Sequence, residues 1–156
     1  KTNWLFPLLI IIFIVVIIVM VKRISTTELI LKKRVNFVKT KGGEFALKVS
    51  LTVNAQKFVE RVSVVDKLPS VTKVHDRFSG PPPTRVDEKT RRIEWNFEKL
   101  EEGETRMVSY IIYSKMGIFG KFALPPATAF YESTGKIKEV HSNRAFFVSE
   151  QSKEEE

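Results

Sequence analysis

Apolar residues fill the first part of the chain without a polar interruption. No residue from Trp4 to Val21 is charged, and the ten positions from Leu8 to Ile17 are all Leu, Ile, Phe or Val. About 18 apolar residues, at 1.5 Å of rise per residue, match a hydrocarbon core roughly 30 Å thick. The pattern therefore predicts a transmembrane helix over residues 4–21. The residues that we assign to the membrane are Trp4, Leu5, Phe6, Leu8, Ile10, Phe13, Val16, Met20 and Val21.

Both flanks of this run are typical of a membrane span. Trp4 stands at one end, and Lys22 and Arg23 follow the other end, where lipid headgroups lie. A secretory signal peptide ends at a small-residue cleavage site, whereas this run contains no Ala, Gly or Ser. A core helix needs polar residues on its outer face, and the run has none. We predict a single-pass anchor, with membrane lipid as a partner.

After Arg23 the chain changes to an alternation of apolar and polar residues. Over residues 45–54, Phe, Leu, Val, Leu and Val alternate with smaller or polar residues, a period of two that predicts a strand with one buried face. The same period recurs over residues 92–98 and 107–112. Weaker candidates, rich in Val, Ile or aromatic residues, bring the expected number of strands to eight. These candidates cover residues 28–37, 58–66, 71–78, 128–131 and 140–148.

Glycine and proline clusters separate these segments, and no helical stripe occurs among them. Short strands with turn signals between them predict an antiparallel sandwich rather than a parallel sheet. We therefore expect an all-β fold: one immunoglobulin-like β-sandwich domain over residues 24–148, preceded by the single transmembrane helix. Residues 149–156 are polar and end in three glutamates, which predicts an acidic, disordered tail.

Four short motifs follow one another in this region. They are the strand end Val62–Pro69, the apolar segment Ile93–Asn96 around its tryptophan, the turn Leu100–Glu104 with Ser109 and Tyr110 following, and the closing segment Gly120–Ala127 with Tyr131 after it. In this order they resemble the conserved repeat domain of prokaryotic cell-surface proteins, which is an immunoglobulin-like module. The resemblance implies a binding, spacer or adhesion role. It also implies tandem copies, whereas this chain has one.

Residues that carry out catalysis are scarce. The chain has no cysteine, two histidines, no Gly-x-Ser-x-Gly motif and no glycine-rich phosphate loop. We therefore predict no enzyme and no cofactor. His75 and Asp76, together with Asp66 or with Asp87 and Glu88, are the residues that could bind a divalent cation, but the EF-hand spacing is missing. We expect solvated turns and no metal site there, and we expect Asp66 to accept backbone N–H bonds at a strand end.

Basic residues predominate, with a net charge of +8. Several of them lie close to the anchor, which suits either attraction to anionic lipid or an ordinary solvated strand surface: Lys22, Arg23, Lys32, Lys33, Arg34, Lys39 and Lys41. No basic motif of a known nucleic-acid reader is present, so we expect no nucleic-acid partner. The positive-inside rule places the domain in the cytoplasm, whereas the family resemblance places it outside. We favour the outside of a cell membrane.

A second apolar feature surrounds Gly117: Met116 precedes this glycine, and Ile118 and Phe119 lie between it and Gly120, in a segment that would normally be polar. These residues are our candidates for a contact with lipid or a partner, the alternative being a loop that caps the sandwich. Taken together, the sequence predicts a membrane-anchored module that binds or positions a protein partner. The alternative is a small accessory subunit of a membrane complex, assembled mainly through its transmembrane helix.

Overall fold

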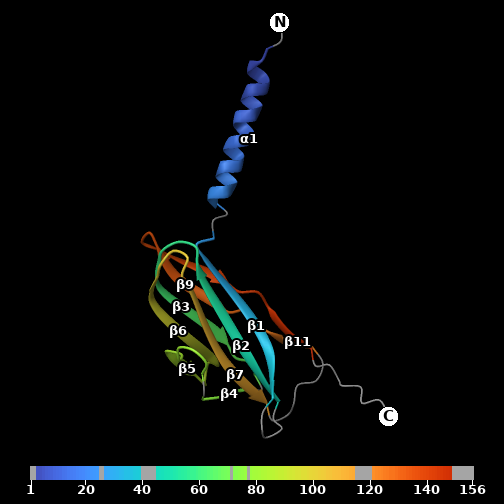
Figure 1. The fold of residues 1–156 in the computed structure, drawn as a ribbon, viewed down its shortest axis with the longest axis vertical. Coiled ribbons are helices and arrows are strands. Elements are labelled where there is room, and N and C mark those ends of the chain that lie inside the picture. Colours follow the sequence, from blue (N-terminus) through green and yellow to red (C-terminus); the bar gives the residue numbers. More distant parts are fainter. Residues whose placement is uncertain are drawn as a thin grey trace, which may run out of the picture.

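The computed structural model describes residues 3–24, 27–39, 45–70, 72–76, 78–114 and 121–148. One N-terminal helix precedes a region of antiparallel strands (Figure 1). The elements are α1 (Leu5–Ile24), β1 (Leu29–Lys39), β2 (Phe45–Ala55), β3 (Val59–Lys67), β4 (Lys73–Val74), β5 (Arg85–Asp87), β6 (Arg92–Leu100), β7 (Thr105–Ser114), β8 (Lys121–Leu124), β9 (Thr128–Ser133), β10 (Lys136–His141) and β11 (Ala145–Val148). The prediction of an all-β region after one apolar N-terminal helix is confirmed.

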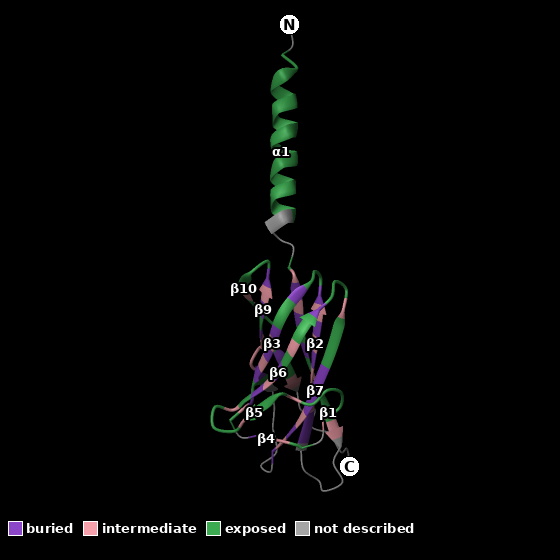
Figure 2. Ribbon diagram, turned by 90° about the vertical axis from the view of Figure 1, so that its left-hand side faces the viewer, coloured by how far each residue is buried: buried purple, intermediate pink, exposed green. Residues whose placement is uncertain are grey.

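Helix α1 is long and apolar enough to cross a membrane, a test that an N-terminal signal sequence also passes. Its large apolar side chains from Leu5 to Val21 are each between 44% and 71% exposed. No described strand covers the helix, which extends away from the sheets (Figure 2). The helix therefore exposes apolar side chains on every face.

The strands form a four-stranded sheet in the order β1-β2-β7-β4, a five-stranded sheet in the order β10-β9-β3-β6-β5, and a β8–β11 pair. One apolar cluster joins the sheets, because residues such as Val49 and Leu51 of the first sheet and Ile93 and Trp95 of the second belong to it. The alternation in β2 is confirmed, since Leu47, Val49, Leu51 and Val53 have no exposed surface.

Several strand boundaries differ from the expectation. The segment 71–78 was expected to be one strand, yet among its described residues only Lys73 and Val74 are in a strand, β4. The last expected strand, 140–148, is divided between β10 and β11. Residues 128–141 form a hairpin instead of an isolated strand, because Thr134 and Gly135 both have positive φ, at 51° and 74°. Positive φ at both central residues is what a two-residue hairpin turn with the twist of the strands requires.

The pairing of β1, β2 and β7 defines two ends of the β region. At the helix-side end, Leu29 is opposite Ala55, and Thr105 is opposite Asn54. At the far end, Tyr113 of β7 pairs with Lys73 of β4. Because a strand rises by about 3.4 Å per residue, the eight residue steps from Thr105 to Tyr113 span roughly 27 Å.

Candidate binding cleft

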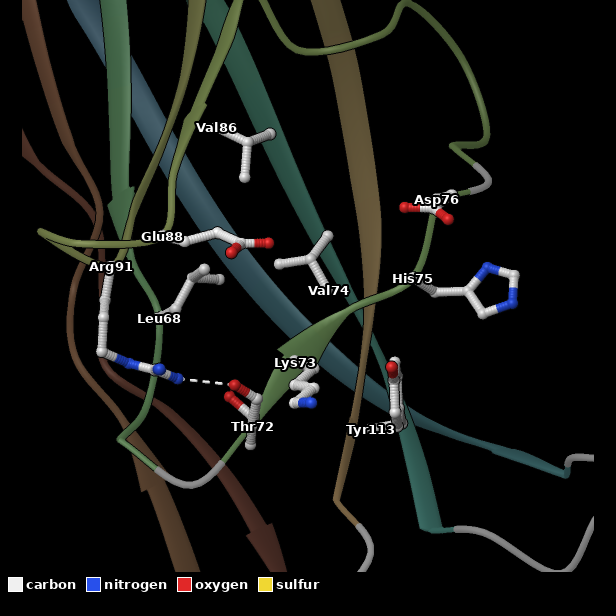
Figure 3. A pocket seen from close by; sticks show the side chains of 10 residues that line it. All are labelled: Leu68, Thr72, Lys73, Val74, His75, Asp76, Val86, Glu88, Arg91 and Tyr113. Atoms are coloured by element: carbon white, nitrogen blue, oxygen red, sulfur yellow. Dashed lines mark hydrogen bonds between the residues drawn. The ribbon is translucent and has the colours of Figure 1, made fainter.

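A cleft of about 790 Å³ opens at the far end of the β region, and Figure 3 shows the side chains that line it. It lies between β4 and β5, which are the edge strands of the two larger sheets. Its volume is in the range of small-molecule sites. The residues that line it are Leu68, Thr72, Lys73, Val74, His75, Asp76, Val86, Glu88, Arg91 and Tyr113.

A tight turn between β5 and β6 forms one wall of the cleft. Asp87 Oδ1 accepts hydrogen bonds from the backbone N–H groups of Lys89, at 3.0 Å, and Thr90, at 3.1 Å. The hydrogen bond from the Thr90 backbone, more than any other interaction, lowers the pKa of Asp87. An aspartate that caps its own turn in this way is a common stabiliser of loops. Asp87 thus shapes the turn, and its carboxylate is committed to that role.

Arg91 connects the two walls. Its guanidinium donates a hydrogen bond of 2.6 Å to the Thr72 carbonyl (Figure 3) and another to the Pro69 carbonyl. The Arg91 carbonyl accepts from the Leu68 N–H at 2.8 Å. The loop after β3 is therefore fixed to the turn before β6 by hydrogen bonds that Arg91 both donates and accepts.

The remaining lining groups are chemically mixed. Lys73, Asp76 and Glu88 are exposed and carry charges of both signs. The His75 ring meets the Tyr113 ring edge-on, with centroids 6.5 Å apart and planes at 77°. Val86 adds an apolar surface that is 41% exposed. The lining therefore places aromatic, apolar and charged groups side by side.

Asp66, expected at a solvated strand end, is buried in the core instead. It accepts a hydrogen bond from Lys33 Nζ at 2.7 Å and another from the Tyr110 hydroxyl at 2.5 Å. Lys33 Nζ also donates to the Pro125 carbonyl at 2.7 Å. This polar bridge joins β1 and β7 of one sheet to β3 of the other. Within the described part of the chain, no three acidic, histidine or cysteine side chains gather closely enough to hold a metal.

Lys33 is a residue whose role the sequence analysis missed. It was expected either near lipid headgroups or on a solvated surface, but its side chain has no exposed surface. The pattern did contain a signal, because Lys33 follows Leu29 and Leu31 at every second position, and both leucines are buried. Desolvation lowers the pKa of Lys33 and raises that of Asp66, while the attraction between them opposes both shifts.

The other predicted site residues are those assigned to lipid headgroups and to the apolar contact segment. Lys22 is exposed at the end of α1, whereas the side chain of Arg23 lies outside the described residues. Met116, Ile118 and Phe119 also lie outside them. The described residue just before that segment, Ser114, pairs with Phe45 at the far end of the sheet.

No protein-family model matches the chain, and no curated protein matches it. Among solved structures, it resembles a GH20 exo-β-N-acetylglucosaminidase from Vibrio harveyi in complex with N-acetylglucosamine, with a TM-score of 0.55, 11% identity, and coverage of 82% of this chain and 20% of the enzyme. An inactive mutant of that enzyme gives a TM-score of 0.52, 11% identity, and coverage of 75% and 18%. The chain thus spans about a fifth of the length of the enzymes that it resembles.

These comparisons correct one prediction. The sequence was expected to exclude an enzyme, but the two solved structures described above are GH20 enzymes, which contradicts that exclusion. At 11% identity the likeness shows a shared fold alone.

Proposed function

We propose that the chain is a single-pass, membrane-tethered module with an immunoglobulin-like β-sandwich, which binds a protein partner at its far end. Two antiparallel sheets around one core and the ordered sequence motifs support the immunoglobulin-like assignment. The exposure of α1 supports the membrane tether, because each large apolar side chain left in water costs about 1.5 to 3 kcal/mol relative to burial. The family resemblance supports a location on the outer side of the membrane.

The observation that carries this proposal is that the helix and the cleft lie at opposite ends of the same strands. Helix α1 leads into β1 at Leu29, which is opposite Ala55. The cleft is built around Tyr113, about eight residue rises further along β7. A tether at one end holds that end close to the bilayer, so the other end is the part most accessible to a partner.

The lining of the cleft favours a protein segment over a polyanion. Lys73 and Arg91 are accompanied by Asp76 and Glu88, so the site has no excess of one charge. The guanidinium of Arg91 is already hydrogen-bonded to two carbonyl groups. Tyr113 supplies an aromatic contact of the kind that anchors protein interfaces, and Val86 adds an exposed apolar surface to the lining.

Site-specific photo-crosslinking in the native membrane tests the proposal. A photoreactive amino acid at position 86 or 113 should give one discrete protein adduct, because both residues line the cleft. Position 107 is the matched control, since Met107 is 61% exposed on β7 and is not part of the cleft lining. Equal adducts at all three positions, or none from the cleft, would contradict the proposed site.

A second variant distinguishes binding at the cleft from the alternative of an accessory subunit that assembles through its helix. In this variant, an unrelated poly-leucine helix of the same length replaces α1. If the partner binds the cleft, the adduct from position 86 persists in this variant. If assembly depends mainly on α1, the adduct disappears although the protein is still inserted and folded. Far-ultraviolet circular dichroism and membrane fractionation supply those two controls.

A further inference from the structure

We propose that the helix-side end of the β region rests in the surface of the bilayer, with Ile137 and Phe58 as lipid contacts. This inference rests on the membrane tether proposed above. It assigns a second, separate surface to the molecule, because the cleft lies at the opposite end of the strands.

Side-chain hydrogen bonds link β10 and the residues that follow it to β1 and the residue before it. Lys138 Nζ donates to Glu28 Oε1 at 2.9 Å, and the Asn143 amide bonds the backbone N–H and carbonyl of Lys33, each at 2.9 Å. Both pairs are separated by 110 residues in sequence. The two segments therefore run parallel, and Ile137 lies one residue rise closer to α1 than Lys138. The hairpin turn projects further, roughly 10 Å beyond Lys138 at about 3.3 Å per residue.

The covalent link to α1 leaves little space above this hairpin. Helix α1 ends at Ile24, and the chain is held again at Glu28, whose carbonyl accepts the N–H groups of Gln56 and Lys57 at 2.8 and 3.3 Å. Four residue steps span at most about 14 Å even when fully extended. The hairpin turn lies on the α1 side of Lys138 and faces this gap, so it lies close to the headgroup layer, which is about 5 to 7 Å deep on each side of the bilayer.

The side chains at this end are suited to that layer. Ile137 is 80% exposed, the largest exposed fraction of any described large apolar side chain, and Phe58 beside the β2–β3 turn is 45% exposed. Figure 2 shows β9 and β10 at the end nearest α1. Lys57 and Lys136 are their sequence neighbours, and lysine stems can lie along an apolar surface while the ammonium group stays at the interface.

Apolar insertion, more than charge, explains the contact. The basic residues at this end are accompanied by acidic ones, as in the pairs Lys99–Glu101 and Arg106–Glu104. Net attraction to an anionic surface is therefore small. Removal of the Ile137 side chain from water is favourable in any bilayer, whatever its headgroup charge.

Single-cysteine labelling of the full chain provides the test, because the native sequence contains no cysteine. Variants Ile137→Cys, Phe58→Cys, Val86→Cys and Ile12→Cys are each labelled with an environment-sensitive fluorophore and reconstituted in phosphatidylcholine vesicles that contain nitroxide-labelled lipid. Ile12 reports insertion of α1. Val86 is the matched control, since it is 41% exposed and lies at the far end.

The expected result is a loss of fluorescence at positions 137 and 58 that approaches the loss at position 12, with no loss at position 86. Loss at position 12 without loss at position 137 overturns the lipid contact and leaves the tether standing. No loss at any position overturns both proposals. Equal loss at positions 86 and 137 also overturns the inference, because it means that the whole β region lies flat on the bilayer.

Discussion

Replacement of Lys33 by methionine should destabilise the β region by about 3 to 5 kcal/mol, because it leaves the Asp66 carboxylate buried without its cation. The two groups are 2.7 Å apart, and neither side chain has exposed surface. Methionine retains most of the lysine stem, so the loss of packing is small. Since folded domains are stable by about 5 to 15 kcal/mol, the loss removes a large part of the total.

Replacement of the whole polar bridge should have the opposite outcome. The variant Lys33→Met, Asp66→Leu, Tyr110→Phe leaves no buried charge and no hydroxyl without an acceptor. Buried ion pairs that are exchanged for apolar residues often give a neutral change or a gain of about 1 to 4 kcal/mol. The Pro125 carbonyl loses the Lys33 donor in both variants, so that cost cancels in the comparison.

The pKa shifts agree with this expectation. Burial raises the pKa of Asp66 above 3.8 and lowers the pKa of Lys33 below 10.5. As the pH rises from 3.8 through the folded pKa of Asp66, the folded state holds the extra proton and stability falls. As the pH falls from 10.5 through the folded pKa of Lys33, the unfolded state holds the extra proton and stability falls again. Around neutral pH, both groups therefore favour unfolding relative to the apolar variant.

Urea unfolding of the full chain in detergent, followed by fluorescence, measures both variants. The chain has two tryptophans, so a Trp4→Phe background leaves Trp95, whose ring lies 5.8 Å from that of Tyr110. A cost below about 1 kcal/mol for Lys33→Met would refute the reasoning, because it is what an exposed pair gives. A triple variant as unstable as the single variant would also refute it.

Three further predictions concern the helix-side end and the orientation. Gly135→Ala should lower the free energy of unfolding by about 1 kcal/mol, because alanine is strained at a φ of 74°. Thr134→Gly should be neutral or stabilising, because glycine adopts a φ of 51° without strain. Equal shifts of the melting temperature in the two variants would contradict this. The Lys138 hydrogen bond lowers the pKa of Glu28, so its stability contribution, present above pH 4.5, is lost as the pH falls through the folded pKa. Lys138→Met should flatten that acid-side loss in pH-dependent unfolding, and Lys136→Met should leave it unchanged. In sealed vesicles with the cytoplasmic face outward, the β region should resist added protease, and complete digestion would place it in the cytoplasm.

The sequence predicts the longer strands because their alternation is a local property. In β2 and β6 the apolar positions alone identify the buried face, and Leu51 and Trp95 lie in the core as expected. The short strands could not be predicted in this way. Strand β4 consists of two residues, which pair with Ile112 and Tyr113. That pairing depends on where β7 ends rather than on the sequence of β4.

The cleft and the buried polar bridge could not be predicted from the sequence, for the same physical reason. Lys33 and Asp66 are 33 residues apart, and their contact exists only once two sheets have packed. The lining of the cleft comes from the loop after β3, from β4, from the β5–β6 segment and from β7. No local motif can reveal a surface assembled from four separate segments.

The connection between α1 and β1 limits where a partner can be met. From Glu28 onward the chain is fixed, because the carbonyl of Glu28 bonds the β2–β3 turn and its carboxylate bonds Lys138. The linker therefore cannot lengthen by fraying of β1, whose Leu29 has no exposed surface. With at most about 14 Å of linker and roughly 27 Å of strand, the cleft stays within about 40 Å of the end of α1. A partner must therefore come within about 40 Å of the end of α1. A protein anchored in the same membrane, or held close to it, fits this geometry better than one that remains far from the surface.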